Sequence, residues 1–492
     1  MEYNNNSNKF LLKVDISGIQ NFIFDIPSDG ASKNLKGRSF YVYVLTYFAE
    51  KFFKQNFPSQ TTEIIYNGGG NLLMYLTANE KDLKNKIEDF QSYFLEKDIY
   101  PFVAYAKADD NNFDLQNKQL GKLLNQEKFK RKLNFSPFES SENIDWNGLS
   151  NQLKKSNSFT ISSYDKNKFI SIGKFSLTFD EQNDFSIPLK NNLLNKFPID
   201  KDGNIIDFEE IAQKAYSRGA DEKLAALKMD VDNLGKLFMN RNKGEYRKIS
   251  QAIENFFSVT LYTDILKPYI EKGEIYPVFA GGDDTFIIGA WDKIFEITPC
   301  IHNAFDEAQK EWKKKIKQED DITISAGIVI VHPRFPMIRL ADKVEDTLSL
   351  AKKEGKNRIG VFGECITWEE FKRVYEMMSL LKVLVKEKGE SKALLHRISS
   401  SEIGFRSLQD KINKQNKIDF PKVYRLKYYL RNAKTEENKK QLDEFFENYS
   451  EALLSDFMAD KTKADKSTLT NPAIFPIAAR WTELLIKNKD LK

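Results

Sequence analysis

The chain has 492 residues, 75 of them basic and 71 acidic, with a formal net charge of +4, so it is long enough for three or four domains. A charge so nearly balanced does not by itself indicate a nucleic-acid-binding protein. The only cysteines, Cys300 and Cys365, argue against a secreted disulfide framework, and no apolar run approaches membrane-spanning length. We therefore expect a cytoplasmic protein without a membrane partner.

Two β-rich segments open the chain. Residues 10–15 form an apolar run that ends in Asp15, and residues 63–76 carry a glycine tip at 68–70, followed by Asn71. Strand-forming residues on both sides of a glycine tip predict a hairpin. Glycines there allow positive φ or leave room for a ligand.

The next stretch, residues 111–199, is rich in Asn, Lys and Ser and has only modest strand signals, at 159–162 and 169–172. We expect a small α+β insert. Its basic run 128–132 is typical of a solvated helix face, although it could contact RNA phosphates.

The strongest functional signal is the turn Gly281–Asp284, which lies between two strand-like runs within 274–291. Its adjacent carboxylates, Asp283 and Asp284, repel each other unless a cation holds them, and carboxylate oxygens suit Mg²⁺ or Mn²⁺. Upstream, an apolar strand ends in Asp230, where a helical pattern begins. Turn formation and helix capping would also explain these aspartates. The combination of an acidic strand end and an acidic hairpin favours a metal site.

The pattern around this site predicts the order β-α-β-β-α-β of a ferredoxin-like sheet. Helices are expected at roughly 246–270 and 292–316, a strand at 322–331, and a further helix at 338–353. Gly355 fits the C′ position of that helix. Basic residues in its last turn, including Lys352, suit the helix dipole. An alternative role for Lys352 is to reach a triphosphate.

The N-terminal strand and hairpin repeat this plan. From Asp15 to Asn71 the chain runs almost as far as from Asp230 to Asp284, which predicts an internal duplication. Because Gly70 and Asn71 stand where the second copy has its hairpin carboxylates, we expect the first copy to be catalytically inactive. Its glycine amides could still cradle a nucleotide.

After Trp368 the chain becomes helical, with apolar residues at helical spacing in 380–386 and 442–454. The sequence thus predicts four parts. They are residues 1–110, 111–199, 200–368 and 369–492.

Six motifs occur in order, at 15–24, 35–40, 228–235, 279–284, 325–328 and 351–357. Together they resemble the large, polymerase-like subunit of type III CRISPR effector complexes, in its III-A version. The resemblance implies an α+β fold with two tandem ferredoxin-like palm domains of the GGDEF/cyclase-like type. It also implies a small insert between the palms and a C-terminal helical bundle.

The same resemblance implies an activity. On binding target RNA, such a subunit converts ATP into 3′–5′ cyclic oligoadenylates by two-metal nucleotidyl transfer, with Mg²⁺ or Mn²⁺. Its partners are the CRISPR RNA, the target RNA and the other subunits of the complex.

Carried over to this chain, the resemblance implies a set of site residues. The metal-binding, catalytic carboxylates are Asp230, Asp283 and Asp284. The nucleotide-binding residues are Gly281, Gly282, Lys352, Gly69, Gly70 and Asn71.

Two departures from the family pattern stand out. Many members begin with an HD nuclease domain, whereas the three histidines here, His302, His332 and His396, are scattered and none precedes an aspartate. We therefore expect no DNase activity. Many members also carry a cysteine-rich zinc module between the palms, and two cysteines are too few for such a site, so no zinc is expected.

Two other functions remain open. The same palm chemistry could make a different adenylate signal, such as an S-adenosylmethionine–AMP conjugate. The chain could also be a non-catalytic scaffold, which the intact aspartates argue against. A diguanylate cyclase has a similar second palm, but the tandem arrangement disfavours it.

Overall fold

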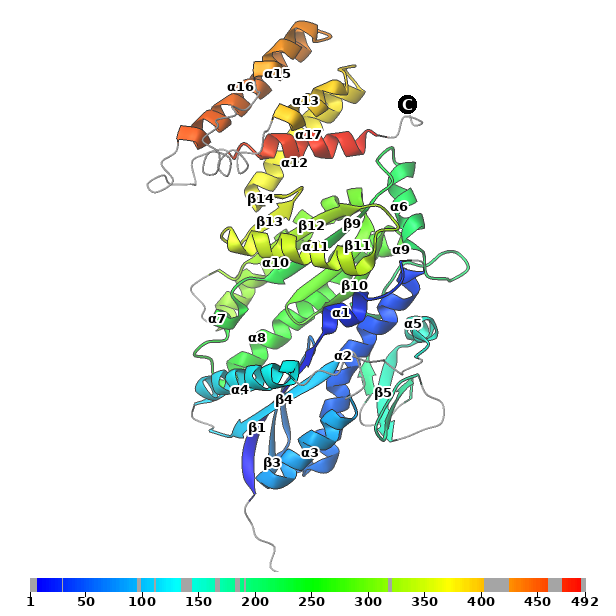
Figure 1. Ribbon diagram of the computed structural model, residues 1–492, viewed down its shortest axis with the longest axis vertical. Coiled ribbons are helices and arrows are strands. Elements are labelled where there is room, and N and C mark those ends of the chain that lie inside the picture. Colours follow the sequence, from blue (N-terminus) through cyan, green and yellow to red (C-terminus); the bar gives the residue numbers. More distant parts are fainter. Residues whose placement is uncertain are drawn as a thin grey trace, which may run out of the picture.

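The computed structural model describes residues 7–28, 30–94, 99–109, 112–133, 144–163, 169–181, 186–189, 192–316, 321–401, 424–458 and 471–487. In Figure 1 the N-terminal sheet lies at the bottom, a larger sheet in the middle and the C-terminal helices at the top. Within the described ranges, every helix is too short or too polar to cross a bilayer.

The N-terminal sheet, called here the first palm, has the strand order β2-β3-β1-β4. Its elements are β1 (Asn8–Ser17), α1 (Ile19–Phe24), α2 (Ala31–Asn56), η1 (Ser59–Thr61), β2 (Glu63–Gly68), β3 (Asn71–Ala78), α3 (Glu80–Ser92), β4 (Tyr100–Lys107) and α4 (Phe113–Leu133). Alternation along β1 buries Phe10 and Leu12 in the main core and Leu11 in a second core with Leu120 of α4. Helices therefore cover both faces of this sheet.

The second palm has the strand order β10-β11-β9-β12-β13-β14. Its elements are β9 (Leu224–Val231), α7 (Leu234–Leu237), α8 (Lys243–Asn255), η3 (Phe256–Leu266), α9 (Lys267–Glu271), β10 (Ile275–Gly281), β11 (Asp284–Ala290), α10 (Trp291–Ile316), β12 (Ile324–Val331), α11 (Met337–Lys353), β13 (Arg358–Val361) and β14 (Glu364–Thr367). The expected β-α-β-β-α-β order is confirmed. The helix expected at 246–270 instead has a π-helical middle, and Pro268, which has no amide hydrogen, lies in the first turn of α9.

The strand registers support the internal duplication. In the first palm Asp15 of β1 lies directly opposite Asn71 of β3. In the second palm Asp230 of β9 lies directly opposite Asp284 of β11. Since both sheets place their equivalent strands in the same order, the two palms are copies of one plan that differ at the hairpin.

At the boundary between the palms, a helix of each palm packs on the hairpin of the other. Tyr276 on β10 donates a 2.6 Å hydrogen bond to the carbonyl of Ser32 on α2. In return, Arg247 on α8 donates a 2.8 Å bond to the carbonyl of Ile64 on β2 and pairs with Glu63 at 2.8 Å. Each palm's helix thus packs on the other palm's hairpin, which brings the two hairpin tips together.

The motif at 35–40 belongs to this boundary. Lys36 is buried and donates hydrogen bonds to the carbonyls of Leu193 (2.8 Å) and Pro277 (2.9 Å). Arg38 and Ser39, in the same motif, lie inside α2 rather than at its start, because the helix begins at Ala31. The motif joins the palms.

Residues between the palms form a separate small sheet, with the order β6-β7-β5-β8, beside α2. Its elements are α5 (Trp146–Lys155), β5 (Ser158–Ser163), β6 (Ser171–Ile172), β7 (Phe175–Phe179), β8 (Ser186–Pro188) and η2 (Leu193–Asn195), followed by α6 (Phe208–Ser217). The four-part division stays a prediction, and α4 packs on the first sheet although it lies beyond residue 110.

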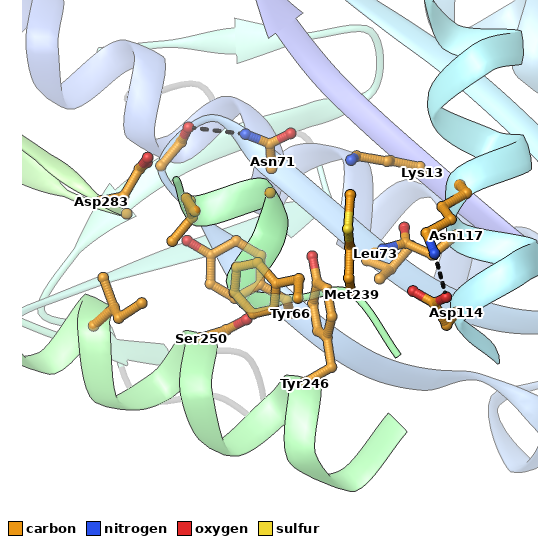
Figure 2. A pocket seen from close by; sticks show the side chains of 17 residues that line it. Lys13, Tyr66, Asn71, Leu73, Asp114, Asn117, Met239, Tyr246, Ser250 and Asp283 are labelled. Carbon is orange, nitrogen blue, oxygen red and sulfur yellow. Dashed lines mark hydrogen bonds and ion pairs between the residues drawn. The ribbon is translucent and has the colours of Figure 1, made fainter. Parts of the chain in front are cut away.

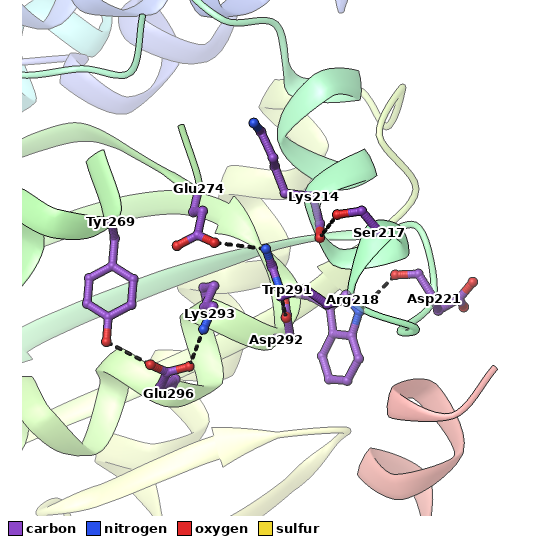
Figure 3. A network of polar contacts seen from close by, with 10 residues as sticks. All are labelled: Lys214, Ser217, Arg218, Asp221, Tyr269, Glu274, Trp291, Asp292, Lys293 and Glu296. Atoms are coloured by element: carbon purple, nitrogen blue, oxygen red, sulfur yellow. Dashed lines mark hydrogen bonds and ion pairs between the residues drawn. The ribbon is translucent and has the colours of Figure 1, made fainter. Parts of the chain in front are cut away.

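The C-terminal helices are α12 (Trp368–Lys386), α13 (Ala393–Ser401), α15 (Tyr424–Tyr429), η4 (Leu430–Asn432), α16 (Glu436–Met458) and α17 (Ile474–Leu485). Next to these helices, a polar network joins the segment between α6 and β9 to the second palm, and one member, Asp221, also contacts α17 (Figure 3). Arg218 donates to Asp292 at 2.7 Å and to Glu274 at 2.8 Å. Nearby, Asp221 accepts from the Trp291 indole at 2.9 Å and donates its backbone N–H to Leu484 of α17 at 2.8 Å. The second palm is thereby fixed at the edge away from its hairpin.

Candidate active site

The candidate site is built on the β9–β11 pair, which places the carboxylates of Asp230 and Asp284 opposite each other on one face of the sheet. Lys228, two residues before Asp230, lies on the same face. Its ammonium is 3.9 Å from Asp284 and 2.5 Å from Glu345 of α11. From the last turn of α11, Lys352 forms an ion pair with Asp230.

Burial makes this cluster of carboxylates costly to ionise. It raises the pKa of Asp284 to about 8, although the charge of Lys228 opposes the shift. Burial, with the charge of Asp230, raises the pKa of Asp283 to about 6. The pKa of Asp230 is also raised by burial and is lowered in part by Lys352. The three aspartates therefore lie where added positive charge would stabilise them.

A neighbouring aspartate has a structural task instead. Asp232 is buried and accepts hydrogen bonds from Ser325 (2.8 Å), Thr323 (2.9 Å) and the backbone N–H of Asn357 (2.9 Å). It ties the end of β9 to β12 and to the loop after α11. Two of the six motifs, at 325–328 and 351–357, thus meet at one carboxylate.

The expected helix end after Lys352 is confirmed. Gly355 has φ +128° and follows the C-cap residue Glu354, and the Lys356 N–H donates to the carbonyl of Ala351 at 3.2 Å. This turn holds Lys352 over the sheet. The helix-dipole explanation and a role in the site are therefore compatible.

A cavity of about 300 Å³ lies between the two palms (Figure 2). Of the expected site residues, it is lined by Gly69, Asn71, Gly282 and Asp283. Asn71 is held by a 3.2 Å hydrogen bond from its side-chain amide to the carbonyl of Gly69. The remaining expected residues do not line this cavity; they are Asp230, Asp284, Lys352, Gly70 and Gly281. Asp283 therefore links the cavity to the carboxylate pair on the sheet.

Aromatic and polar side chains that the sequence did not single out complete the cavity. They include Lys13, Tyr66, Phe238, Tyr246 and Ser250. Tyr246 of the second palm lies against Phe238 with ring centroids 4.3 Å apart and against Phe113 of α4 at 5.5 Å. The cavity is thus shared by both palms, and its far wall is aromatic.

The donor set suits a divalent cation. Three aspartates lie at a strand end and an adjoining turn, and their hard oxygens are the ligands that Mg²⁺ and Mn²⁺ prefer. Among the described residues, no group of three or more carboxylate, histidine or cysteine side chains is gathered tightly enough to hold an ion in this conformation. Lys352 and Lys228 supply the positive charge there instead.

The first palm keeps part of the same cluster. Lys13 stands two residues before Asp15, as Lys228 stands before Asp230. Lys128 of α4 forms an ion pair with Asp15, as Lys352 of α11 does with Asp230. Lys128 belongs to the basic run for which a solvated helix face was expected, and that expectation is wrong for this residue. An alignment of the two palm sequences would have matched Lys128 with Lys352.

These features define a class of protein with two tandem palm domains, only one of which has an acidic hairpin. Two family models match it: "Cas10/Cmr2, second palm domain" over residues 223–360 and "Csm1 subunit domain B" over residues 8–143. Together these matches take in more than half of the chain. The chain thus contains a second palm domain of the Cas10/Cmr2 type and a domain B of the Csm1 type, and its relatives are named Cas10/Csm1 of subtype III-A.

Individual relatives agree. The chain is 26% identical to the CRISPR system single-strand-specific deoxyribonuclease Cas10/Csm1 (subtype III-A) of Methanocaldococcus jannaschii, over 80% of this chain and 64% of that protein. It is 23% identical to the protein of the same name from Enterococcus italicus, over 79% of this chain and 59% of that protein. The chain thus spans less than two thirds of the length of these relatives.

A solved structure confirms the fold. The crystal structure of a Csm1–Csm4 cassette in complex with cA3 superposes with a TM-score of 0.69 at 19% identity, over 97% of this chain and 70% of that one. The expected α+β fold with tandem palms and a helical part is confirmed.

Proposed function

We propose that this chain is the nucleotidyl-transferring subunit of a type III CRISPR effector complex. On target RNA binding it converts ATP into 3′–5′ cyclic oligoadenylates. The observation that carries the proposal is the carboxylate pair Asp230 and Asp284, which adjoins Asp283 at the wall of a cavity formed by both palms. The proposal is supported by the solved structures of cassettes with a similar fold in complex with cA3 and with ATP.

In this proposal Asp230, Asp283 and Asp284 hold Mg²⁺ or Mn²⁺. When bound, these ions would activate the attacking hydroxyl and neutralise the triphosphate. Gly281 and Gly282 let the turn approach the nucleotide closely. Lys352, whose ammonium now neutralises Asp230, is placed to contact phosphate once that carboxylate has another partner.

A second nucleotide would lie against the first palm. Gly69 and Asn71 line the shared cavity and Gly70 shapes the turn between them, so backbone amides and an amide side chain face the ligand. Lys13 lines the same cavity, and Lys128 stands beside it at Asp15. Around Asp15, these two lysines leave net positive charge, which suits phosphate groups. The other charged side chains of the cavity wall are Lys118, which pairs with Asp114 at 2.6 Å, and Asp283.

The partners follow from the same proposal. They are the CRISPR RNA and the target RNA, reached through the complex, and the other subunits of a type III effector. Solved relatives are Csm1–Csm4 assemblies, which supports this placement.

The test is mass spectrometry of the products formed from ATP by the reconstituted complex with target RNA, with and without S-adenosylmethionine. Cyclic oligoadenylates in both reactions are expected. A product that forms only with S-adenosylmethionine would favour a conjugate. Absence of any adenylate product from a complex that binds target RNA would favour a scaffold.

A further inference from the structure

The two hairpin turns touch each other backbone to backbone. A Cβ atom on Gly69 would lie 2.9 Å from the Cα of Gly282, and one on Gly282 would lie 3.1 Å from the Cα of Gly69. Neither position has room for a side chain. The conformation of the acidic turn therefore depends on where the first palm's turn lies.

One carboxylate lies at this junction. Glu254, in the last turn of α8, accepts a hydrogen bond from the backbone N–H of Gly282. The hydroxyl of Tyr66, on β2 of the first palm, donates to the same oxygen at 3.4 Å. A Cβ atom on Gly68 would lie 2.8 Å from that oxygen, so the first palm's hairpin is also shaped around Glu254.

The acidic turn is held from its other side by β9. The Val231 N–H donates a 3.1 Å hydrogen bond to the carbonyl of Asp283. Glu254 thus holds the N–H of Gly282, and Val231 holds the carbonyl of Asp283. With a hydrogen bond at each end of this two-residue segment, the backbone that carries the Asp283 side chain is restricted.

We propose that Glu254 is a positioning residue for the cation-binding aspartates, and that through Tyr66 and Gly68 it makes their geometry depend on the first palm. The inference rests on the proposed function, because it assumes that Asp283 and Asp284 bind cations. Glu254 acts as a hydrogen-bond acceptor in this role. It is not itself a cation ligand.

Two variants distinguish the role of Glu254 as a hydrogen-bond acceptor from the effect of its negative charge. Glu254→Gln keeps an oxygen that can accept from the Gly282 N–H, whereas Glu254→Ala removes it. Gln251→Ala is the matched control, since Gln251 is exposed on the same helix. The probe is Mn²⁺ alone, titrated into the full chain and followed by electron paramagnetic resonance.

We expect Glu254→Ala to raise the Mn²⁺ dissociation constant about 10-fold, the equivalent of one hydrogen bond to a charged group. Glu254→Gln and Gln251→Ala should stay within about twofold of wild type on the same scale. Unchanged Mn²⁺ affinity in Glu254→Ala overturns the proposal. So does an equal loss in Glu254→Gln, because that would make Glu254 a ligand.

Two measurements keep the test decisive. If Glu254→Ala does not fold, amide hydrogen exchange at Gly282 replaces it. Protection in wild type that falls in Tyr66→Phe supports the proposal, and an unprotected Gly282 amide overturns it. If the double variant Asp283→Ala with Asp284→Ala binds Mn²⁺ with the same affinity as wild type, the cation site of the proposed function is refuted instead.

Discussion

The four strands of the first palm have the same order as the first four strands of the second palm's sheet, and both palms have an aspartate near the end of their first strand, yet their hairpins differ in charge. Opposite Asp230 the second palm has Asp284, whereas opposite Asp15 the first palm has Asn71. In both palms a lysine forms an ion pair with the strand aspartate: Lys128 of α4 in the first palm and Lys352 of α11 in the second. In the proposed function, the loss of two hairpin carboxylates with retention of the lysines suits the first palm to an anion and the second to cations, on the same scaffold.

The largest effect is expected from removing the acidic hairpin. Asp283→Ala with Asp284→Ala should lower nucleotide synthesis by at least about 1000-fold, since a single well-placed positive charge on a transferring phosphoryl group is worth that much. Product analysis of the assembled complex measures it. Complex assembly and target RNA binding should survive, because the turn contributes little to the core. Product at wild-type levels would remove this hairpin from the chemistry.

The next test compares the two lysines. Lys352→Ala should lower synthesis about 100-fold, because in the proposed function this lysine contacts the reacting triphosphate. Lys128→Ala should raise the KM for ATP about 10-fold, as expected for one lost charged contact. Lys122→Ala, at an exposed position on α4, is the control. If Lys352→Ala and Lys128→Ala lower kcat equally, the proposed functional difference between the two palms is contradicted.

A smaller loss is expected from restoring carboxylates to the first palm. Gly70→Asp with Asn71→Asp should reduce synthesis several-fold, because added negative charge repels phosphates. Gly70 has φ +76° and lies close to Ile19, so Gly70→Ala with Asn71→Ala controls for backbone strain. A doubled rate of synthesis from the aspartate variant would mean that the first palm lacked only its metal ligands.

No effect at all is expected for DNA. The 492-residue chain, in the assembled complex with target RNA, should not cleave labelled single-stranded DNA with Mg²⁺, Mn²⁺, Co²⁺ or Ni²⁺. His302 stacks on Trp368 with centroids 4.1 Å apart, so it is engaged in packing. Cleavage that persists without Asp230, Asp283 and Asp284 would reveal a nuclease site, as the names of the relatives suggest for those proteins.

Much of this organisation could be predicted from the sequence because it is local. Each of three predictions depends on neighbouring residues only, and the structure confirms all three. They are the strand that ends near Asp230, the hairpins at the glycine tips and the order of the helices. The pairing of Asp15 with Asn71 agrees with the internal duplication, which the nearly equal spacing in the two copies predicted.

What the sequence did not reveal depends on contacts between distant segments. In the sequence, Glu254 is not distinguishable from other acidic residues on an amphipathic helix. Its hydrogen bond with Gly282 is evident only when the two hairpins are brought together in the fold. Lys128 belongs to a basic run, and only the packing of α4 on β1 brings it to Asp15. Lys36 is buried between carbonyls that lie far along the chain.

The joint made by Lys36 also bears on how the chain folds. Its partner carbonyl at Pro277 is 241 residues away in sequence, so the contact closes a very long loop. During synthesis the first palm emerges with α2 lacking its β10 partner, and the boundary forms only after the second palm has been made. We expect this step to be slow and the waiting α2 surface to be the place where chaperones act. The two palms should then unfold as one cooperative unit.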